Sequence, residues 1–182
     1  MVKPKRIILG VTGSIAAYKS ADVLRRLSEK GFKVSVVMTK EAERFITPTT
    51  LSALAGEKVY REMFEHNDDS WQMPHIRLAE EADILLVAPA TAAMIGKLAY
   101  GIADNLLTCI ALATKAKLLI APAMNTEMYQ NKIVQENCAR LKMFGAHFIG
   151  PVKGKLACGT TGEGHIADVD TIVDAVVRAV KK

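Results

Sequence analysis

Residues 118–129 read Leu-Leu-Ile-Ala-Pro-Ala-Met-Asn-Thr-Glu-Met-Tyr, an apolar run that enters a Pro turn and continues into a polar segment typical of a helix start. In an open α/β sheet, ligands bind beyond the carboxyl ends of such strands. Asn125, at the end of the turn, fits two interpretations. Its amide either contacts a ligand or caps the helix that follows, and from this segment alone the cap is the simpler interpretation.

Residues 83–90 repeat this ending. They read Asp-Ile-Leu-Leu-Val-Ala-Pro-Ala, a continuous apolar run of the kind that a strand buried on both faces requires. The segments between the two runs, residues 91–100 and 104–114, have helical patterns. Two parallel strands with the same Pro turn place both turns at one edge of the sheet, where the small Ala residues leave a floor for a flat ligand.

The N-terminal part of the chain predicts a βαβ unit. Two short β-branched runs, residues 6–11 and 33–38, flank residues 14–31, in which apolar side chains recur at helical spacing. With the two later strands, this pattern predicts a single α/β domain over residues 1–182, a Rossmann-like (flavodoxin-like) parallel sheet flanked by helices on both faces. Further helices are expected at residues 41–45, 48–55, 127–144 and 169–180.

The turn after the first strand, residues 10–15, reads Gly-Val-Thr-Gly-Ser-Ile and can direct backbone N–H groups at a phosphate. Lys19 and Ser20 resemble the end of a nucleoside-triphosphate loop, but Tyr18 stands where that loop requires Gly. The spacing also differs from the GxGxxG of dinucleotide sites, and the second strand ends in Met38-Thr39-Lys40 without the acidic ribose ligand of those sites. A site for FMN or another monophosphate stays open, as does a purely structural turn.

The composition excludes several classes of protein. Half of the 182 residues are hydrophobic and a quarter are charged, which is typical of a globular domain. The longest apolar run, residues 84–90, is far short of the roughly 20 residues that cross a bilayer. The three cysteines form no CxxC pair, no metal cluster is visible, and the net charge of +5 is spread along the chain. We therefore expect a cytoplasmic protein with reduced thiols that binds no metal, membrane or nucleic acid.

Four isolated side chains are candidates for chemistry or for the core. Cys109 and Cys138 lie in apolar or helical patterns, which predicts that both are in the core. His75 stands alone in Pro-His-Ile-Arg-Leu, where a structural role is the more frequent one. Cys158 lies in residues 154–164, a segment with four Gly and no apolar periodicity, which predicts a mobile loop with either a reactive or an incidental thiol.

Taken together, six motifs resemble one family, the homo-oligomeric flavin-containing cysteine decarboxylases, over nearly the whole chain. The Asn motif and the Cys motif are the most specific, because flavin prenyltransferases share the fold and the Gly-Ser turn but not this pair. The motifs are Gly-Ser-Ile (13–15), Pro-His-Ile-Arg-Leu (74–78), Ala-Pro-Ala-Thr-Ala (88–92), Gly-Ile-Ala-Asp-Asn-Leu-Leu (101–107), Pro-Ala-Met-Asn-Thr-Glu-Met-Tyr (122–129) and Leu-Ala-Cys-Gly-Thr-Thr-Gly-Glu-Gly (156–164).

The resemblance implies FMN-dependent decarboxylation of a cysteine-derived substrate, with phosphopantothenoylcysteine of coenzyme A biosynthesis as the nearest match. Oxidation of the CH2–SH group gives a thioaldehyde, loss of CO2 gives an enethiol, and reduction returns a saturated thiol. In this scheme His75 is the base, Asn125 holds the carboxylate and Cys158 supplies the final proton. Because the family builds its FMN site between subunits, we expect a homotrimer, or a homododecamer assembled from trimers.

The resemblance also assigns binding residues. For FMN they are Gly13, Ser14, Ile15, Thr39, Lys40, Thr91, Ala92 and Ala123, and for the substrate they are Met124, Asn125, Ala157 and Cys158. A flexible flap is expected over about residues 151–167. Lys153 and Lys155 in this flap fit either a contact with the substrate phosphate or a solvated loop position, and the solvated position is the simpler interpretation. The chain departs from frequent family residues at Ala93, Met94, Tyr129, His165 and Ile166, so no substrate contact is assigned to His165 or Ile166.

Two other functions stay open: decarboxylation of a cysteine in a peptide, and a non-catalytic role in phosphatase regulation. In many bacteria the decarboxylase is fused to a ligase that this sequence does not contain. We therefore expect either a free-standing decarboxylase or a domain excised from such a fusion.

Overall fold

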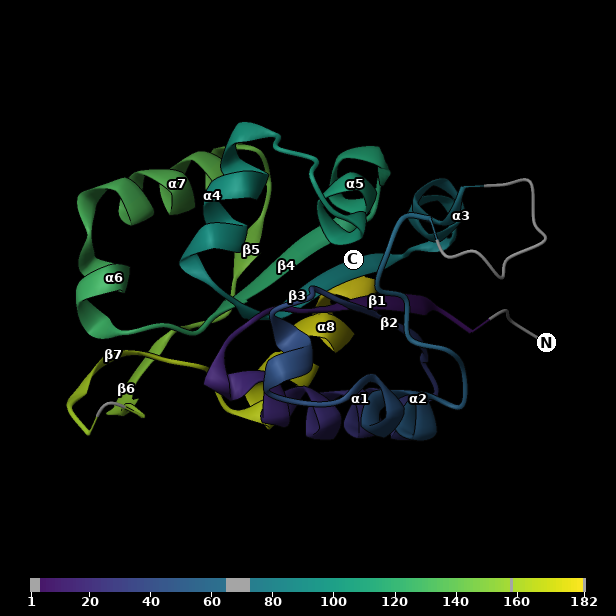
Figure 1. Ribbon diagram of the computed structural model, residues 1–182, viewed down its shortest axis with the longest axis horizontal. Helices are drawn as coiled ribbons and strands as arrows, with labels where there is room; N and C mark the ends of the chain where they lie inside the picture. Colours follow the sequence, from purple (N-terminus) through teal and green to yellow (C-terminus); the bar gives the residue numbers. More distant parts are fainter. Residues whose placement is uncertain (1–3, 65–72, 158, 182) are drawn as a thin grey trace.

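The computed structural model describes residues 4–64, 73–157 and 159–181. Its centre is a parallel sheet with the strand order β2-β1-β3-β4-β5 (Figure 1). The predicted α/β class and parallel sheet are confirmed, and the four longer strands agree with the predicted runs to within one residue. The strands are β1 (Arg6–Val11), β2 (Lys33–Met38), β3 (Ile84–Ala90), β4 (Lys117–Pro122) and the short β5 (His147–Phe148), which was not predicted.

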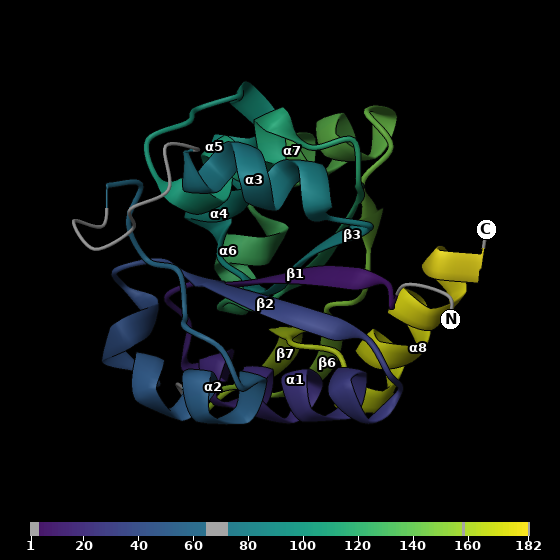
Figure 2. The ribbon, with the colours of Figure 1, turned by 90° about the vertical axis from the view of Figure 1, so that its right-hand side faces the viewer.

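Helices cover both faces of the sheet, as predicted. One face carries α1, α2 and α8, and the other carries α3, α4, α5 and α7 (Figures 1 and 2). Alternate strand residues enter separate cores: Ile7 and Leu9 pack toward the first group of helices, and Ile8 packs toward the second. A strand buried on both faces needs no polar side, which explains the continuous apolar runs.

The helices begin with a 3-10 turn η1 (Ile15–Tyr18), followed by α1 (Lys19–Glu29), the 3-10 turn η2 (Ala42–Arg44), α2 (Pro48–Ala55), α3 (Pro74–Glu81), α4 (Ala92–Tyr100), α5 (Leu106–Ala113), α6 (Thr126–Gln130), α7 (Lys132–Met143) and α8 (Val169–Lys181). Within the described ranges, none of these helices combines the length and the apolar character needed to cross a membrane.

The order of the strands reverses at β1, because β2 lies on one side of it and β3 on the other. Such a switch point opens a crevice at the carboxyl ends of the two strands. Thr12, which follows β1, joins these ends: its hydroxyl donates to the Pro89 carbonyl oxygen at 2.8 Å and accepts from the Thr91 N–H at 3.1 Å. The turns after β1 and β3 are therefore held side by side.

Two predictions about the elements are wrong. Residues 127–144 do not form one helix, because α6 ends and α7 begins at Asn131, whose extended backbone interrupts the helix and whose side chain accepts from the Ile133 N–H at 2.9 Å. Residues 154–164 are not a featureless loop, because β6 (Val152–Lys155) and β7 (Thr161–His165) pair as an antiparallel hairpin. The hairpin lies beyond the edge at which the parallel strands end (Figure 1).

The two described cysteines differ in their burial. Cys138 of α7 is in the core as predicted, with 2% of its surface exposed. Cys109 of α5 is only half-buried, and its Sγ contacts the Ala103 carbonyl oxygen, 3.5 Å away, beside the exposed start of the helix. The prediction of a core position is thus wrong for Cys109. Burial is the main cause that raises the pKa of both thiols.

Candidate active site

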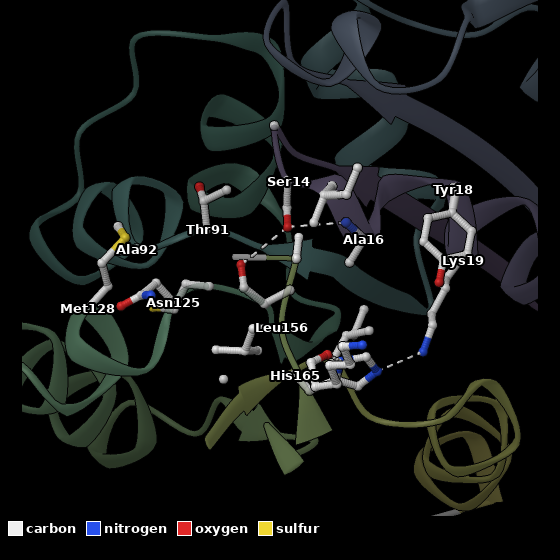
Figure 3. Close-up of a pocket in the computed structure, with 18 of the residues that line it drawn as sticks. Ser14, Ala16, Tyr18, Lys19, Thr91, Ala92, Asn125, Met128, Leu156 and His165 are labelled. Carbon is white, nitrogen blue, oxygen red and sulfur yellow. Dashed lines mark hydrogen bonds between the residues drawn. The ribbon is translucent and has the colours of Figure 1, made fainter. Parts of the chain in front are cut away.

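A cavity of about 700 Å³ opens at the carboxyl edge of the sheet (Figure 3). The turn after β1, the turns after β3 and β4 and the β6–β7 hairpin enclose it. Its volume is in the range of roughly 300–1,000 Å³ that is usual for cofactor and substrate sites. The lining residues are Gly13, Ser14, Ile15, Ala16, Tyr18, Lys19, Thr91, Ala92, Ala123, Met124, Asn125, Met128, Lys155, Leu156, Ala157, Gly159, Gly164, His165 and Ile166.

The cavity brings together most of the residues that were assigned to FMN. Those that line it are Gly13, Ser14, Ile15, Thr91, Ala92 and Ala123. They meet because β1, β3 and β4 are neighbours in the sheet and end at one edge. Thr39 and Lys40, which follow β2, do not line the cavity.

Two helix caps position the floor of the cavity. Ser14 caps η1 from an extended backbone, and its Oγ accepts from a backbone N–H and donates to the Ala123 carbonyl oxygen, each at 3.3 Å. Thr91 caps α4, its Oγ1 accepting from the Met94 N–H at 3.2 Å. The small side chains of Ala92 and Ala123 leave the surface between these caps open to a flat ring system.

Thr39, at the neighbouring strand end, was also assigned to FMN but lies outside the cavity lining. Its side chain is buried, and its Oγ1 has no hydrogen-bond partner among the described residues. Its backbone N–H donates to the Val11 carbonyl oxygen at 3.0 Å, which holds it beside the turn after β1. An unsatisfied buried hydroxyl costs roughly 1–3 kcal/mol. The residues present therefore fit FMN: a flat apolar floor for its rings and hydroxyls at adjoining strand ends for its polar groups.

Asn125 both caps a helix and lines the cavity. Its Oδ1 accepts from the Glu127 N–H at 2.8 Å, at the start of α6. Both interpretations of Asn125 therefore hold for one side chain. Thr126 does not share in the cap, because its Oγ1 is buried and has no hydrogen-bond partner among the described residues. The cap fixes the orientation of the Asn125 amide, which lies at one end of the cavity near Met128 and Thr91 (Figure 3).

The hairpin is held against the turn after β4 by backbone contacts that require glycine. The Met124 N–H donates to the Gly164 carbonyl oxygen at 3.0 Å. Gly164 has φ +146°, and a Cβ there would collide with the Met124 carbonyl oxygen. A Cβ at Gly162 would likewise collide with the Thr126 side chain. The Gly residues that suggested a loop instead permit close packing of the hairpin.

Of the predicted substrate residues, Met124, Asn125 and Ala157 line the cavity. Cys158 lies outside the described residues, so its predicted role as the final acid stays a prediction. Lys155 also lines the cavity, whereas it had been interpreted as a solvated loop residue together with Lys153.

His75 is not among the residues that line the cavity. It lies in the first turn of α3, in the helical layer on the opposite side of the sheet from α1 and α8 and away from the hairpin (Figures 1 and 2). Its Nδ1 is buried without a hydrogen-bond partner among the described residues. The cavity therefore contains Asn125 but not His75.

Lys19 and His165, which also line the cavity, form a pair that was not predicted. The Lys19 Nζ lies 3.2 Å from the His165 Nε2, and the His165 Nδ1 lies 3.2 Å from the Lys155 carbonyl oxygen. An ammonium can only donate and a carbonyl can only accept, so this arrangement assigns the ring proton to Nδ1. The two residues are 146 positions apart. Their contact depends on the position of β7, which ends at His165, and the β6–β7 hairpin was not predicted.

The comparisons with known proteins agree with this geometry. A model of the Flavoprotein family matches residues 1–181, and the chain belongs to that family. Within it, the chain is 47% identical to a probable phosphopantothenoylcysteine decarboxylase of Streptococcus mutans, over 94% of this chain and 97% of that protein. It is 43% identical to the coenzyme A biosynthesis bifunctional protein of Bacillus subtilis, over 95% of this chain and 42% of that protein, so it spans less than half of that relative.

Solved structures show the same relationship. A mutant of phosphopantothenoylcysteine (PPC) decarboxylase in complex with pantothenoylaminoethenethiol has a TM-score of 0.87 and 32% identity, covering 99% of this chain and 100% of that chain. The FMN-dependent cysteine decarboxylase SpaF has a TM-score of 0.82 and 29% identity, covering 96% of this chain and 97% of that chain. The resemblance inferred from the motifs is thus confirmed: this is a flavoprotein similar over its whole length to carboxy-lyases.

Proposed function

We propose that the chain catalyses the FMN-dependent decarboxylation of N-(4'-phosphopantothenoyl)-L-cysteine to 4'-phosphopantetheine and CO2, in the cytoplasm. The observation that carries this proposal is the single cavity in which the predicted flavin residues lie beside Met124, Asn125 and Ala157. The proposed substrate follows the names of the relatives. The Streptococcus mutans protein is named for this decarboxylation, and the Bacillus subtilis bifunctional protein is named for coenzyme A biosynthesis.

The reaction needs an electron sink, because loss of CO2 from a cysteine derivative otherwise leaves an unstabilised carbanion. Bound FMN supplies that sink, by reversible oxidation of the CH2–SH carbon. Gly13, Ser14 and Ile15, with Thr91, Ala92 and Ala123, would hold it against the sheet edge. The hairpin closes the cavity from the other side and would limit the access of water to the reacting carbon.

Asn125 would bind the substrate carboxylate. Its side chain is already fixed by the bond to the Glu127 N–H, so little rotamer freedom is lost when a substrate binds. The Cys158 thiol would deliver the last proton to carbon, and the His75 imidazole would remove the first.

The position of His75 bears on the assembly. Since His75 is absent from the cavity of its own subunit, we propose that it enters the cavity of a neighbouring copy, in a homotrimer or in a dodecamer of trimers. This arrangement reconciles the predicted base with the geometry, because α3 is in a different layer from the hairpin (Figure 2).

The proposal is tested on the purified protein. We expect a yellow protein that retains FMN and converts phosphopantothenoylcysteine to 4'-phosphopantetheine with one CO2 per turnover, followed by mass spectrometry and by trapping of CO2. The Lys153→Met variant, altered on the hairpin but outside the cavity lining, serves as the matched control and should behave as wild type. A colourless protein that releases no CO2 would contradict the proposal.

A second candidate is decarboxylation of a peptide that ends in cysteine. The observation in its favour is the likeness to a solved peptidyl-cysteine decarboxylase, with a TM-score of 0.79 and 25% identity over 99% of this chain and 100% of that one. A peptide ending in Cys, assayed beside the phosphopantothenoyl substrate, distinguishes the two. Faster turnover of the peptide would replace the first proposal with this one.

A further inference from the structure

The end of the cavity away from Asn125 is positively charged. Figure 3 shows Lys19 and His165 on one side and Asn125, Thr91 and Met128 on the other. Lys155 lines the same cavity and carries the carbonyl oxygen to which the His165 ring is bound. Among the described residues that line the cavity, none is Asp or Glu.

Lys19 differs from its neighbours on α1 in what it contacts. Arg25 and Arg26 each pair with a carboxylate oxygen at 2.9 Å, that of Glu29 and that of Asp170. Lys19 instead donates to a neutral ring nitrogen, and among the described ion pairs it has none. Its positive charge therefore has no counter-ion among the described residues and faces the cavity, where it can donate to an anion.

We infer that Lys19 and His165, assisted by Lys155, form a subsite for a phosphomonoester on the arm of the substrate. This inference rests on the proposed function and names what that function leaves open, namely how the phosphorylated arm is recognised. Of the residues assigned to FMN, Thr91 lies toward the Asn125 end and Ser14 lies between the two ends (Figure 3), whereas Lys155 and His165 belong to the hairpin that also carries Ala157, a predicted substrate residue. The cationic end therefore belongs to the part of the cavity that is assigned to the substrate.

The hairpin already orients the His165 ring toward Lys19 within the cavity. The bond from the His165 Nδ1–H to the Lys155 carbonyl oxygen orients the ring, so that Nε2 and the Lys19 ammonium point at one place. A phosphate oxygen that replaces the contact between them accepts from the ammonium and, when a proton is added to the imidazole, from Nε2 as well. Hydrogen bonds of this kind, with charges on both partners, are about twice as strong as neutral ones. A substrate without the phosphate would leave the pair unsatisfied.

The test measures kcat/KM with two substrates, phosphopantothenoylcysteine and pantothenoylcysteine, which differ only in the phosphate. The variants are Lys19→Met, Lys19→Arg and His165→Asn, in which the Asn amide can still reach the Lys155 carbonyl oxygen. We expect the preference of the wild type for the phosphorylated substrate to fall about 10- to 100-fold in Lys19→Met, as for loss of a charged hydrogen bond. His165→Asn should also lose preference, and Lys19→Arg should retain most of it.

The Lys153→Met control separates a specific contact from the general field of the protein, because it removes one positive charge from the same hairpin outside the cavity lining. It should keep the wild-type preference. An equal loss of kcat/KM with both substrates in Lys19→Met, or the same loss of preference in Lys153→Met, would overturn the subsite.

Two further measurements identify which phosphate is bound and keep this inference separate from the proposed function. The FMN content of Lys19→Met, read from flavin absorbance, should match wild type. A loss of flavin with an unchanged substrate preference would assign the pair to the cofactor and overturn the inference.

Calorimetry on the FMN-loaded protein with 4'-phosphopantothenate and pantothenate needs no turnover. A phosphate-dependent affinity that Lys19→Met abolishes supports the subsite even if no CO2 is released, and equal affinity of wild type for both compounds overturns it.

Discussion

At the scale of single residues, Asn125 joins the fold to the proposed chemistry, because one amide caps α6 and lines the cavity. The two roles can be separated by substitution. Asp caps helices about as well as Asn, whereas Ala removes the cap at a cost of about 1 kcal/mol. Asn125→Asp should therefore unfold within about 0.5 kcal/mol of wild type, and Asn125→Ala should be the less stable variant.

The effect of the same variants on activity should have the opposite order. In Asn125→Asp a carboxylate replaces the amide donor and repels the substrate carboxylate, so we expect kcat/KM for decarboxylation to fall roughly 100-fold or more, with a smaller loss in Asn125→Ala. Urea unfolding and CO2 release measure the two effects. If Asn125→Asp were as active as wild type, Asn125 would be only a helix cap.

At the scale of elements, α7 packs its buried face against α4 and carries Cys138 there. Burial raises the pKa of this thiol above its ordinary value of 9.0, so the folded chain holds the proton more tightly than the unfolded chain does. The resulting stabilisation is complete below the unfolded pKa and is lost as the pH rises through the folded pKa. We expect the free energy of unfolding to fall with pH above about 9, and less steeply in Cys138→Ala.

Urea unfolding of wild type and Cys138→Ala across the alkaline range measures this difference. Cys109→Ala is a suitable comparison, because the thiol of Cys109 is only half-buried and its removal should change the pH dependence less. Parallel curves for wild type and Cys138→Ala would show that the buried thiol does not titrate in this range.

The elements that could be predicted from sequence are those whose burial leaves a pattern. β1, β3 and β4 are covered on both faces, so their apolar runs are continuous and their ends are marked by Gly or Pro turns. The β6–β7 hairpin was missed because its strands are largely exposed and rich in Gly, with no alternation to detect. The break between α6 and α7 was missed because the apolar spacing continues through Asn131.

The same reasoning explains what could be predicted of the site. Ser14, Thr91 and Ala123 follow three parallel strands, and parallel strands bring their ends together whatever their distance in the sequence. Lys19 and His165 meet only through the hairpin, whose register no local pattern reveals. His75 does not follow one of these strands but lies in the first turn of α3, so the shared edge of the sheet does not bring it to the cavity.

At the scale of the whole molecule, the layer that contains α3 presents apolar side chains to solvent. Tyr100, Leu112 and Phe144 are 64%, 56% and 74% exposed. The Arg140 guanidinium lies over both the Tyr100 and the Phe144 rings, 5.3 and 5.5 Å from their centroids, so these two rings and Arg140 form one patch. Exposed apolar patches of this kind commonly mark contacts between proteins. This patch supports an assembly in which the α3 layer of one copy meets another copy.

In such an assembly two inactive variants should restore activity when they are co-expressed, which a site within one subunit could not do. His75→Asn and Asn125→Asp subunits should each be inactive alone. If every cavity combines Asn125 of one subunit with His75 of the next, co-expression at equal amounts gives on the order of one quarter of the cavities both native residues, and that share of wild-type activity returns. Separately purified assemblies of the two variants, mixed without exchange of subunits, are the control and should stay inactive. If both residues acted within one subunit, every subunit in the co-expressed assemblies would carry one defect and no activity would return.

Light scattering on the same preparation should give a mass of roughly three times the 19.8 kDa of the chain, or a multiple of that trimer.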